Sequence, residues 1–134
     1  MTGLQALPGI GPIVASALYA AVGNGSQFIK GRQMSAWIGI TPAHFGTGGK
    51  NTNVGSTKKG DQYLRTLLIH GARTVVSWII INNKSDPLSC WVQRLVARRG
   101  KRKTYVALAN KITRVAWRIL QGELYDQKKI TAQY

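Results

Sequence analysis

The residues best suited to chemistry lie between Thr41 and Arg73, where a glycine-punctuated polar stretch precedes a predicted helix. Glycine lets a backbone approach a ligand closely, lysine carries the charge opposite to phosphate, and the free N–H groups at a helix start attract anions. The stretch supplies all three, with Gly46, Gly48, Gly49, Gly55, Lys50, Lys58 and Lys59. We therefore expect it to contact a sugar-phosphate backbone, with Arg65 and Arg73 extending the contact along the helix.

A second glycine pair, Gly9 and Gly11, brackets Ile10 in a short Pro-Gly-Ile-Gly-Pro hairpin. The hairpin resembles the helix-hairpin-helix element of many DNA repair and recombination proteins. In that element the glycines expose backbone N–H groups to a phosphate, while the central apolar residue anchors the turn inward. The same residues suit a tight turn between two packed helices equally well.

Two further groups of cations lie toward the C-terminus. The densest charge run of the chain is Arg98, Arg99, Lys101, Arg102 and Lys103, interrupted by Gly100. The last predicted helix adds a stripe on the side opposite its apolar residues, made of Lys111, Arg114 and Arg118. Charge runs are usually solvated ends or anion patches rather than active sites, so we assign both groups to nucleic-acid contact.

Metal ligands are scarce in this sequence. Asp61 is placed to favour the positive end of a helix, and His70 lies among apolar neighbours as a semi-buried imidazole would. A single cysteine, Cys90, leaves no disulfide within one chain and no cysteine-rich zinc site, which fits a reducing, cytosolic location. We expect no metal or other cofactor to be held by this chain.

The charge balance points to a polyanionic partner. The 134 residues include 19 Lys and Arg against 4 Asp and Glu, a formal net charge of +15, while a hydrophobic share of 44% allows one domain with its own core. Nucleic acid is the first partner to consider, and a generically cationic or ribosome-like structural role is the alternative. The longest apolar runs, Val75 to Ile81 and Ile13 to Val22, are shorter than the roughly 20 residues of a membrane span, so we expect no membrane partner.

Apolar residues recur at helical spacing throughout, and no alternating strand pattern of any length occurs, which predicts an all-α domain. We expect one domain, 1–134, with a helix-hairpin-helix over 1–24, a helix and glycine/lysine loop over 25–59, a bundle of three longer helices over 60–125 and a tail over 126–134. Ser26 is a candidate cap for the second unit, with Gly39 as its stop, and Ser85 or Asp86 caps a later helix that Gly100 ends. The last helix is expected from Thr104 to about Leu124.

A family resemblance rests on motifs that occur in order along almost the whole chain: LPGIGP, SAWIGITP, TGGK, KKGDQYLRTLLIHGAR and VALANKITRVAW. Together they resemble the C-terminal domain of a bacterial insertion-sequence transposase. The family in question pairs a DEDD-type catalytic domain with a serine in its C-terminal half, and it includes bridge-RNA-guided recombinases.

The resemblance implies that a RuvC-like N-terminal domain binds magnesium through four acidic residues, and that the C-terminal serine hydroxyl becomes joined to cleaved DNA. We expect the RuvC-like domain to be absent from this chain. The chain has only four acidic residues of its own, and they are scattered through the sequence. The resemblance implies DNA as a partner, a guide RNA as in the RNA-guided members, and either further copies of the chain or a separate DEDD domain. It also implies a bacterial protein that acts on DNA in the cytoplasm.

One position departs from the family pattern. Gly46 and Thr47 stand before the Gly-Gly-Lys motif where the family has a pair of serines, which makes Thr47 the candidate nucleophile. A threonine hydroxyl needs a base or metal to activate it and a positive cradle for the phosphate, here Lys50, Lys58 and Arg65. Its extra methyl crowds an in-line attack. The leading hypothesis is therefore a DNA-binding transposase domain that supplies this hydroxyl to strand exchange.

Two other functions compete with that hypothesis. The chain could be a non-catalytic DNA- or RNA-binding remnant of a decayed transposase, an interpretation that the threonine favours. A helix-hairpin-helix glycosylase is the third candidate, but the chain lacks the Asp and Lys that such an enzyme needs beyond the hairpin, since Asp61 is the only acid near a plausible pocket.

Overall fold

The computed structural model describes residues 2–40, 58–83 and 85–123, and its secondary-structure elements are helices. No strand occurs within these ranges, and the all-α prediction is confirmed. The elements are a short 3-10 helix η1 (Thr2–Ala6), α1 (Pro12–Val22), α2 (Gly31–Ile38), α4 (Lys58–Asn82), α5 (Pro87–Arg99) and α6 (Lys101–Leu120). The last three are the longer helices expected from the sequence.

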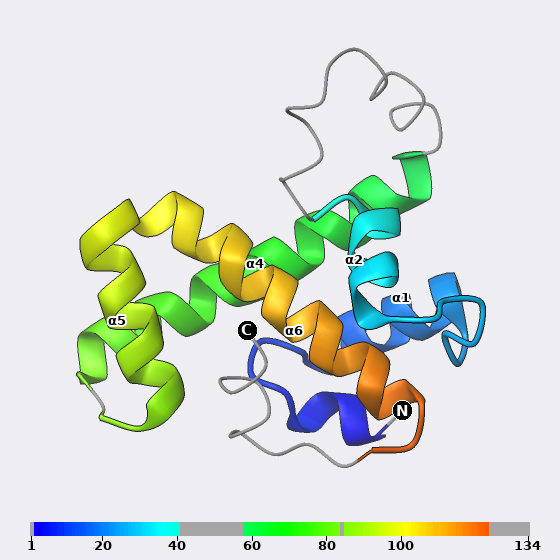
Figure 1. Cartoon of the computed structure of the whole chain (residues 1–134), viewed down its shortest axis with the longest axis horizontal. Coiled ribbons are helices and arrows are strands. Elements are labelled where there is room, and N and C mark those ends of the chain that lie inside the picture. The colour runs from blue at the N-terminus through cyan, green and yellow to red at the C-terminus, as the bar shows by residue number, and fades with distance from the viewer. Residues whose placement is uncertain (1, 41–57, 84, 124–134) are drawn as a thin grey trace.

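The centre of the fold is the crossing of α4 and α6, which Figure 1 shows as the two longest ribbons. The buried side chains of α4 recur every three or four residues and so lie on one face: Leu64, Leu68, Ala72, Val76 and Ile79. Those of α6 include Leu108, Ile112 and Val115. Burial of a Leu, Ile or Val side chain contributes roughly 1.5–3 kcal/mol, so this crossing holds much of the stability.

The other helices pack around the crossing at two ends. η1 and α1 lie against α6 and α4, and α2 lies against both long helices. α5 folds back from the end of α4 to contact α4 and α6. In Figure 1 the α5–α6 junction lies at the left of the view, whereas α2 and the start of α4 lie at the right. The long helices therefore separate two regions of the surface.

Most helix ends occur where the sequence predicts them. Pro12 takes the first turn of α1, where its missing N–H costs nothing, and Gly39 ends α2 in the left-handed conformation with φ of 94°. The Asp86 carboxylate accepts a hydrogen bond from the Ser89 N–H at 3.2 Å and caps α5. Gly100 ends α5, as predicted.

Three predicted boundaries are wrong. α2 begins at Gly31 with Lys30 at its N-cap, because the Ser26 N–H donates to the Asn24 side-chain oxygen at 3.1 Å and closes a local turn instead of starting a helix. α6 begins at Lys101 rather than Thr104, so three cations of the charge run belong to its first turn. The end of α6 at Leu120 is also earlier than expected.

One apolar stretch is longer than the sequence pattern predicted. Gln62–Asn82 is 21 residues with a mean hydropathy of 1.3, long and apolar enough to cross a membrane. In this structure the helix that contains it contacts α1, α2, α5 and α6. The helix lies at the centre of the fold, but only 28% of its most apolar window is buried, and Trp78 and Ile81 are exposed.

Candidate nucleic-acid interface

The densest positive charge lies where α5 turns into α6. Gly100, with φ of 91°, ends the first helix and serves as N-cap of the second, because a positive φ is easy only for glycine. The basic cluster is exposed throughout and consists of Arg98, Arg99, Lys101, Arg102 and Lys103. We call these five residues the basic corner. The structure thus brings together one complete group of the predicted nucleic-acid contacts.

The helix dipole is unfavourable for three of these five charges. Arg98 and Arg99 occupy the last turn of α5, where cations are favourable, but the other three occupy the first turn of α6, at the positive end of its dipole. That turn holds no acidic residue, and Gly100 offers no side-chain cap. Each misplaced cation costs on the order of 0.3–1 kcal/mol. A bound phosphate would remove that cost, so the corner is electrostatically prepared for an anion.

The glycine hairpin is positioned differently. Ile10 is buried and anchors the turn, as expected. Gly9 packs its backbone against Gly71 in the middle of α4: a β carbon built on Gly71 would lie 2.3 Å from the carbonyl oxygen of Gly9. Gly11 is the N-cap of α1 and has open space around it. One glycine of the pair therefore serves helix packing, and the other sits at an accessible helix start.

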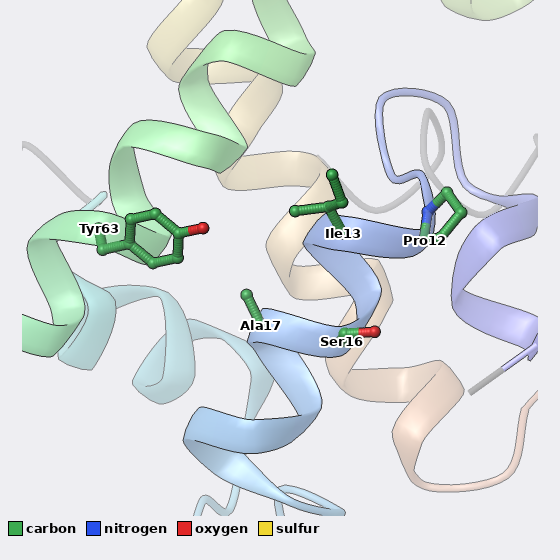
Figure 2. Close-up of a pocket in the computed structure, with 5 residues that line it drawn as sticks. All are labelled: Pro12, Ile13, Ser16, Ala17 and Tyr63. Carbon is green, nitrogen blue, oxygen red and sulfur yellow. The ribbon is translucent and has the colours of Figure 1, made fainter.

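The surface beside the hairpin is apolar rather than charged. Pro12, Ile13, Ser16 and Ala17 of α1 and Tyr63 of α4 line a shallow hollow of about 470 Å³. Figure 2 shows Tyr63 across the hollow from Ile13 and Ala17. Ile13 is 69% exposed and Tyr63 is 61% exposed. The hairpin thus borders an uncovered apolar surface and not a cluster of cations.

The arginines of α4 have different surroundings. Arg65 is half-buried and its guanidinium covers Gly39 at the end of α2, since a β carbon built there would lie 2.5 Å from Nη1. Arg73 is exposed. Lys58 and Lys59 belong to the first turn of α4. The backbone therefore carries four of the predicted cations along a single helix.

The predicted basic stripe of α6 is wrong for Lys111, which is only 2% exposed. Its Nζ lies 4.5 Å from the ring centroid of Trp91 on α5, a cation–π contact. Burial, and secondarily the charge of Arg114, lowers the pKa of Lys111 to about 8. The helix turns this residue toward α5, which the sequence pattern of α6 alone does not reveal.

The other two members of that stripe are half-buried. Arg118 forms an ion pair with Glu123 at 3.7 Å. The backbone of Arg114 approaches Gly31 so closely that a β carbon on the glycine would lie 2.9 Å from the Arg114 carbonyl oxygen. The candidate nucleophile Thr47 and the lysine of its motif, Lys50, lie outside the described residues.

Comparison with known proteins decides the family. The profile described as "Transposase IS116/IS110/IS902 family" matches residues 1–86. The chain belongs to this transposase family. A "Probable family 20 transposase" of Pseudomonas aeruginosa is 49% identical over 120 residues, which are 90% of this chain and 35% of the relative. The "Transposase for insertion sequence element IS1111A" of Coxiella burnetii is 43% identical over 87% of this chain and 32% of the relative.

A third relative, the "Transposase for insertion sequence element IS1328" of Yersinia enterocolitica, is 36% identical over 92% of this chain and 37% of its own length. The chain therefore spans about a third of the transposases it matches. No solved structure matches it.

Possible metal ligands are not clustered in the part of the chain that the structure describes. Within those residues no three His, Cys, Asp or Glu side chains lie close enough together to hold a metal ion. Asp86 is occupied as the cap of α5, and Glu123 pairs with Arg118. The exposed arginine and lysine side chains of the described surface can bind anions.

No functional role was predicted for Trp91 from the sequence. The structure makes it a half-buried side chain on the face of α5 that meets α6, next to the basic corner. Its spacing from Leu95 and Arg98 along α5 was the available signal, because residues four and seven apart share a helix face.

Proposed function

We propose that this chain is the nucleic-acid-binding C-terminal part of an IS110-type transposase, acting in DNA transposition together with a metal-dependent domain. The membership of the family and the net charge of +15 support this function. The observation that carries the proposal is the basic corner, because three of its cations are held at a helix start that disfavours them. Such an arrangement has a physical purpose when a phosphate backbone neutralises it.

In this proposal the backbone contacts come from several places on the fold. The basic corner binds phosphates on one side, and the N–H groups at the accessible start of α1, next to Gly11, bind another. Arg73 adds an exposed cation on α4. These contacts position the protein on DNA without reading bases, so affinity depends little on sequence.

The proposal assigns the reacting hydroxyl to Thr47. In the step, the hydroxyl gives its proton to a base, its oxygen bonds to a backbone phosphorus, and the bond from that phosphorus to the leaving strand oxygen breaks. Lys50, Lys58 and Arg65 are the cations proposed to stabilise the charge that develops on the phosphate oxygens. Magnesium would belong to a separate DEDD domain, and a guide RNA and further copies of the chain are the proposed partners.

A second candidate function is a binding module that carries out no chemistry. Thr47 favours it, because the family resemblance places serine at that position and a β-branched hydroxyl crowds the in-line attack. The same contacts to DNA or RNA would then operate without strand exchange. The two candidates make the same prediction for binding and differ only in covalent chemistry.

Binding is tested by fluorescence anisotropy with the 134-residue chain and unrelated duplex DNA sequences over a series of salt concentrations. The proposal predicts similar affinity for all sequences and a log–log salt slope of about −0.9 for each phosphate neutralised. A flat salt response excludes the backbone contacts and with them both candidates.

Chemistry is tested with a suicide DNA substrate, a DEDD domain from a relative supplied in trans, and magnesium. The proposal predicts a covalent protein–DNA adduct with the native chain, none with Thr47→Ala, and more with Thr47→Ser because the crowding methyl is gone. If neither the native chain nor Thr47→Ser forms an adduct while both still bind DNA, the function is that of the binding module.

A further inference from the structure

A pocket of about 680 Å³ opens between α5 and α6, beside the basic corner. Its apolar lining comes from both helices, with Trp91 and Leu95 on one side and Val106 and Ala107 on the other. The volume lies within the range of roughly 300–1,000 Å³ that is typical of ligand sites. We call it the Trp91 pocket.

The spacing of residues explains how two helices form one pocket. On α5, Trp91, Leu95 and Arg98 are four and three residues apart and share a face. On α6, Lys103, Ala107 and Asn110 follow the same rule. Because Gly100 reverses the chain between them, the two faces meet, and cations from both helices fall at the end nearest the turn.

Two contacts restrain side chains that line the pocket. Lys111 is buried, and its Nζ lies 4.5 Å from the centroid of the indole ring. The Asn110 side chain, which also lines the pocket, accepts a hydrogen bond from the Ser35 hydroxyl on α2. Both contacts restrain the rotamers of the side chains that line the pocket. A restrained aromatic ring and an amide are thus held at the wall of the cavity.

The charge at the pocket has one sign. Four of its lining residues are exposed cations: Arg98, Arg99, Arg102 and Lys103. Asp86, the nearest described acid in the sequence, caps the opposite end of α5, twelve residues before Arg98 and about 18 Å from that cation along the helix. The occupant of such a pocket should therefore carry a flat apolar group and several negative charges close to it.

We propose that the Trp91 pocket receives an unstacked base of a single-stranded or branched nucleic acid, while its rim cations bind the phosphates on either side. This inference rests on the proposed nucleic-acid-binding function and names the form of substrate that the site takes. A base in an intact duplex is stacked on its neighbours and does not enter a side-chain pocket. Stacking on an aromatic side chain tolerates every base, so the site is selective for structure and not for sequence.

The planar guanidinium groups of the rim favour this occupant over an acidic peptide with an apolar anchor. Three of the four rim cations are arginines, which bind phosphate through two parallel hydrogen bonds and stack on bases. A peptide is kept as an outcome of the test.

The test uses the complete chain and three labelled DNAs: a perfect duplex, the same duplex with a bulged thymidine, and a single strand. In the variant Ala107→Phe a large side chain fills the pocket without changing the charge. Its matched control is Ala97→Phe, which adds the same group at an exposed position of α5 outside the pocket. We expect Ala107→Phe to weaken binding of the single strand and the bulge about tenfold, with duplex affinity within about twofold of the native value.

A direct test comes from the native chain alone. The bulged thymidine is replaced by 5-iodouracil, the complex is irradiated, and the adduct is located by mass spectrometry. We expect it on Trp91, within the peptide formed by residues 85–94, and we expect competition by unlabelled single strand to remove it. This measurement stands whether or not Ala107→Phe folds.

The outcomes separate the two proposals. The pocket is overturned, and the proposed function is left in place, by three results together. All three DNAs bind with equal affinity, Ala107→Phe binds them as the native chain does, and adducts form only at residues other than Trp91. The pocket is also overturned as a base site if an acidic peptide binds the native chain more tightly than the single strand does and if Ala107→Phe weakens binding of that peptide. No binding to any of the DNAs overturns the proposed function and the pocket together.

Discussion

The glycine hairpin and the basic corner make opposite use of similar sequence signals. The hairpin has the glycines of a phosphate-binding turn, yet Gly9 packs against Gly71 of α4 and its surface is apolar. The corner looks like a solvated charge run, yet it is built on a glycine reversal beside a cavity with an aromatic wall. A glycine in a phosphate-binding motif can thus be used for close helix packing, and a run of cations can line a pocket.

The difference has an electrostatic cause. The first 29 residues contain no Lys, Arg, Asp or Glu, so the hairpin can contribute only backbone N–H groups to a phosphate. The corner contributes five side-chain charges within six residues, three of them where the helix dipole opposes them. Gly9 of the hairpin therefore contributes to stability, whereas the corner places three cations where the helix dipole is unfavourable.

The largest effect should come from the hairpin contact. Gly71→Val would drive its side chain into the backbone of Gly9, and because two backbones cannot move apart cheaply, we expect the free energy of unfolding to fall by about 3 kcal/mol. Urea denaturation measures it. The matched control is Gly11→Val, which has open space and should be destabilised by only about 1 kcal/mol, through the weaker N-cap. Equal destabilisation would show that the hairpin does not rest on α4.

The second effect concerns the buried cation behind the pocket. The pKa of Lys111 is about 8 in the folded chain and 10.5 in the reference state, so between these values the unfolded chain binds more protons. Stability should therefore rise as the pH increases from about 8 to 10.5. Solvent screening and the cation–π contact with Trp91 reduce the effect, so we expect a rise on the order of 1–2 kcal/mol.

Urea denaturation across this pH range, with Lys111→Met and the exposed control Lys101→Met, checks the assignment. Lys111→Met should abolish the rise, and Lys101→Met should keep it. A native profile parallel to that of Lys111→Met would mean that the lysine is solvated and that Trp91 is not held by it.

The smallest effect should come from the isolated arginine of α4. Arg73→Ala removes one exposed charge, so we expect duplex affinity to fall by roughly two- to fivefold and the salt slope to be smaller by about 0.9. The decrease should be the same on every sequence, since phosphate contacts do not read bases. The control is Ser77→Ala, one turn further along the same helix. A decrease confined to one target sequence would make Arg73 a base contact.

Much of the fold could be predicted from the sequence because its signals are local. Pro12, Gly39, Asp86 and Gly100 fix helix ends through backbone geometry and capping, which depend on neighbouring residues only. The prediction at Ser26 was wrong because this segment forms a turn, in which the Ser26 N–H donates to the Asn24 side chain, and the helix begins only at Gly31.

The site was less predictable because it depends on contacts between distant segments. The burial of Lys111 requires Trp91, which is twenty residues away and on another helix. The packing role of Gly9 requires Gly71. The charge run itself was evident from the sequence, but the pocket beside it appears only when α5 and α6 are folded against each other.

The central claim is that the basic corner is the main phosphate-binding surface of the chain. It is tested most directly by the salt dependence of duplex binding for the native chain and for a variant with Arg98, Arg99, Arg102 and Lys103 all changed to Gln. We predict a steep native slope that falls by about 0.9 for each phosphate that the variant leaves without a cation, roughly 3 to 4 in total, with the fold intact by circular dichroism. An unchanged slope in the variant would contradict the claim and place the nucleic-acid interface elsewhere on the protein.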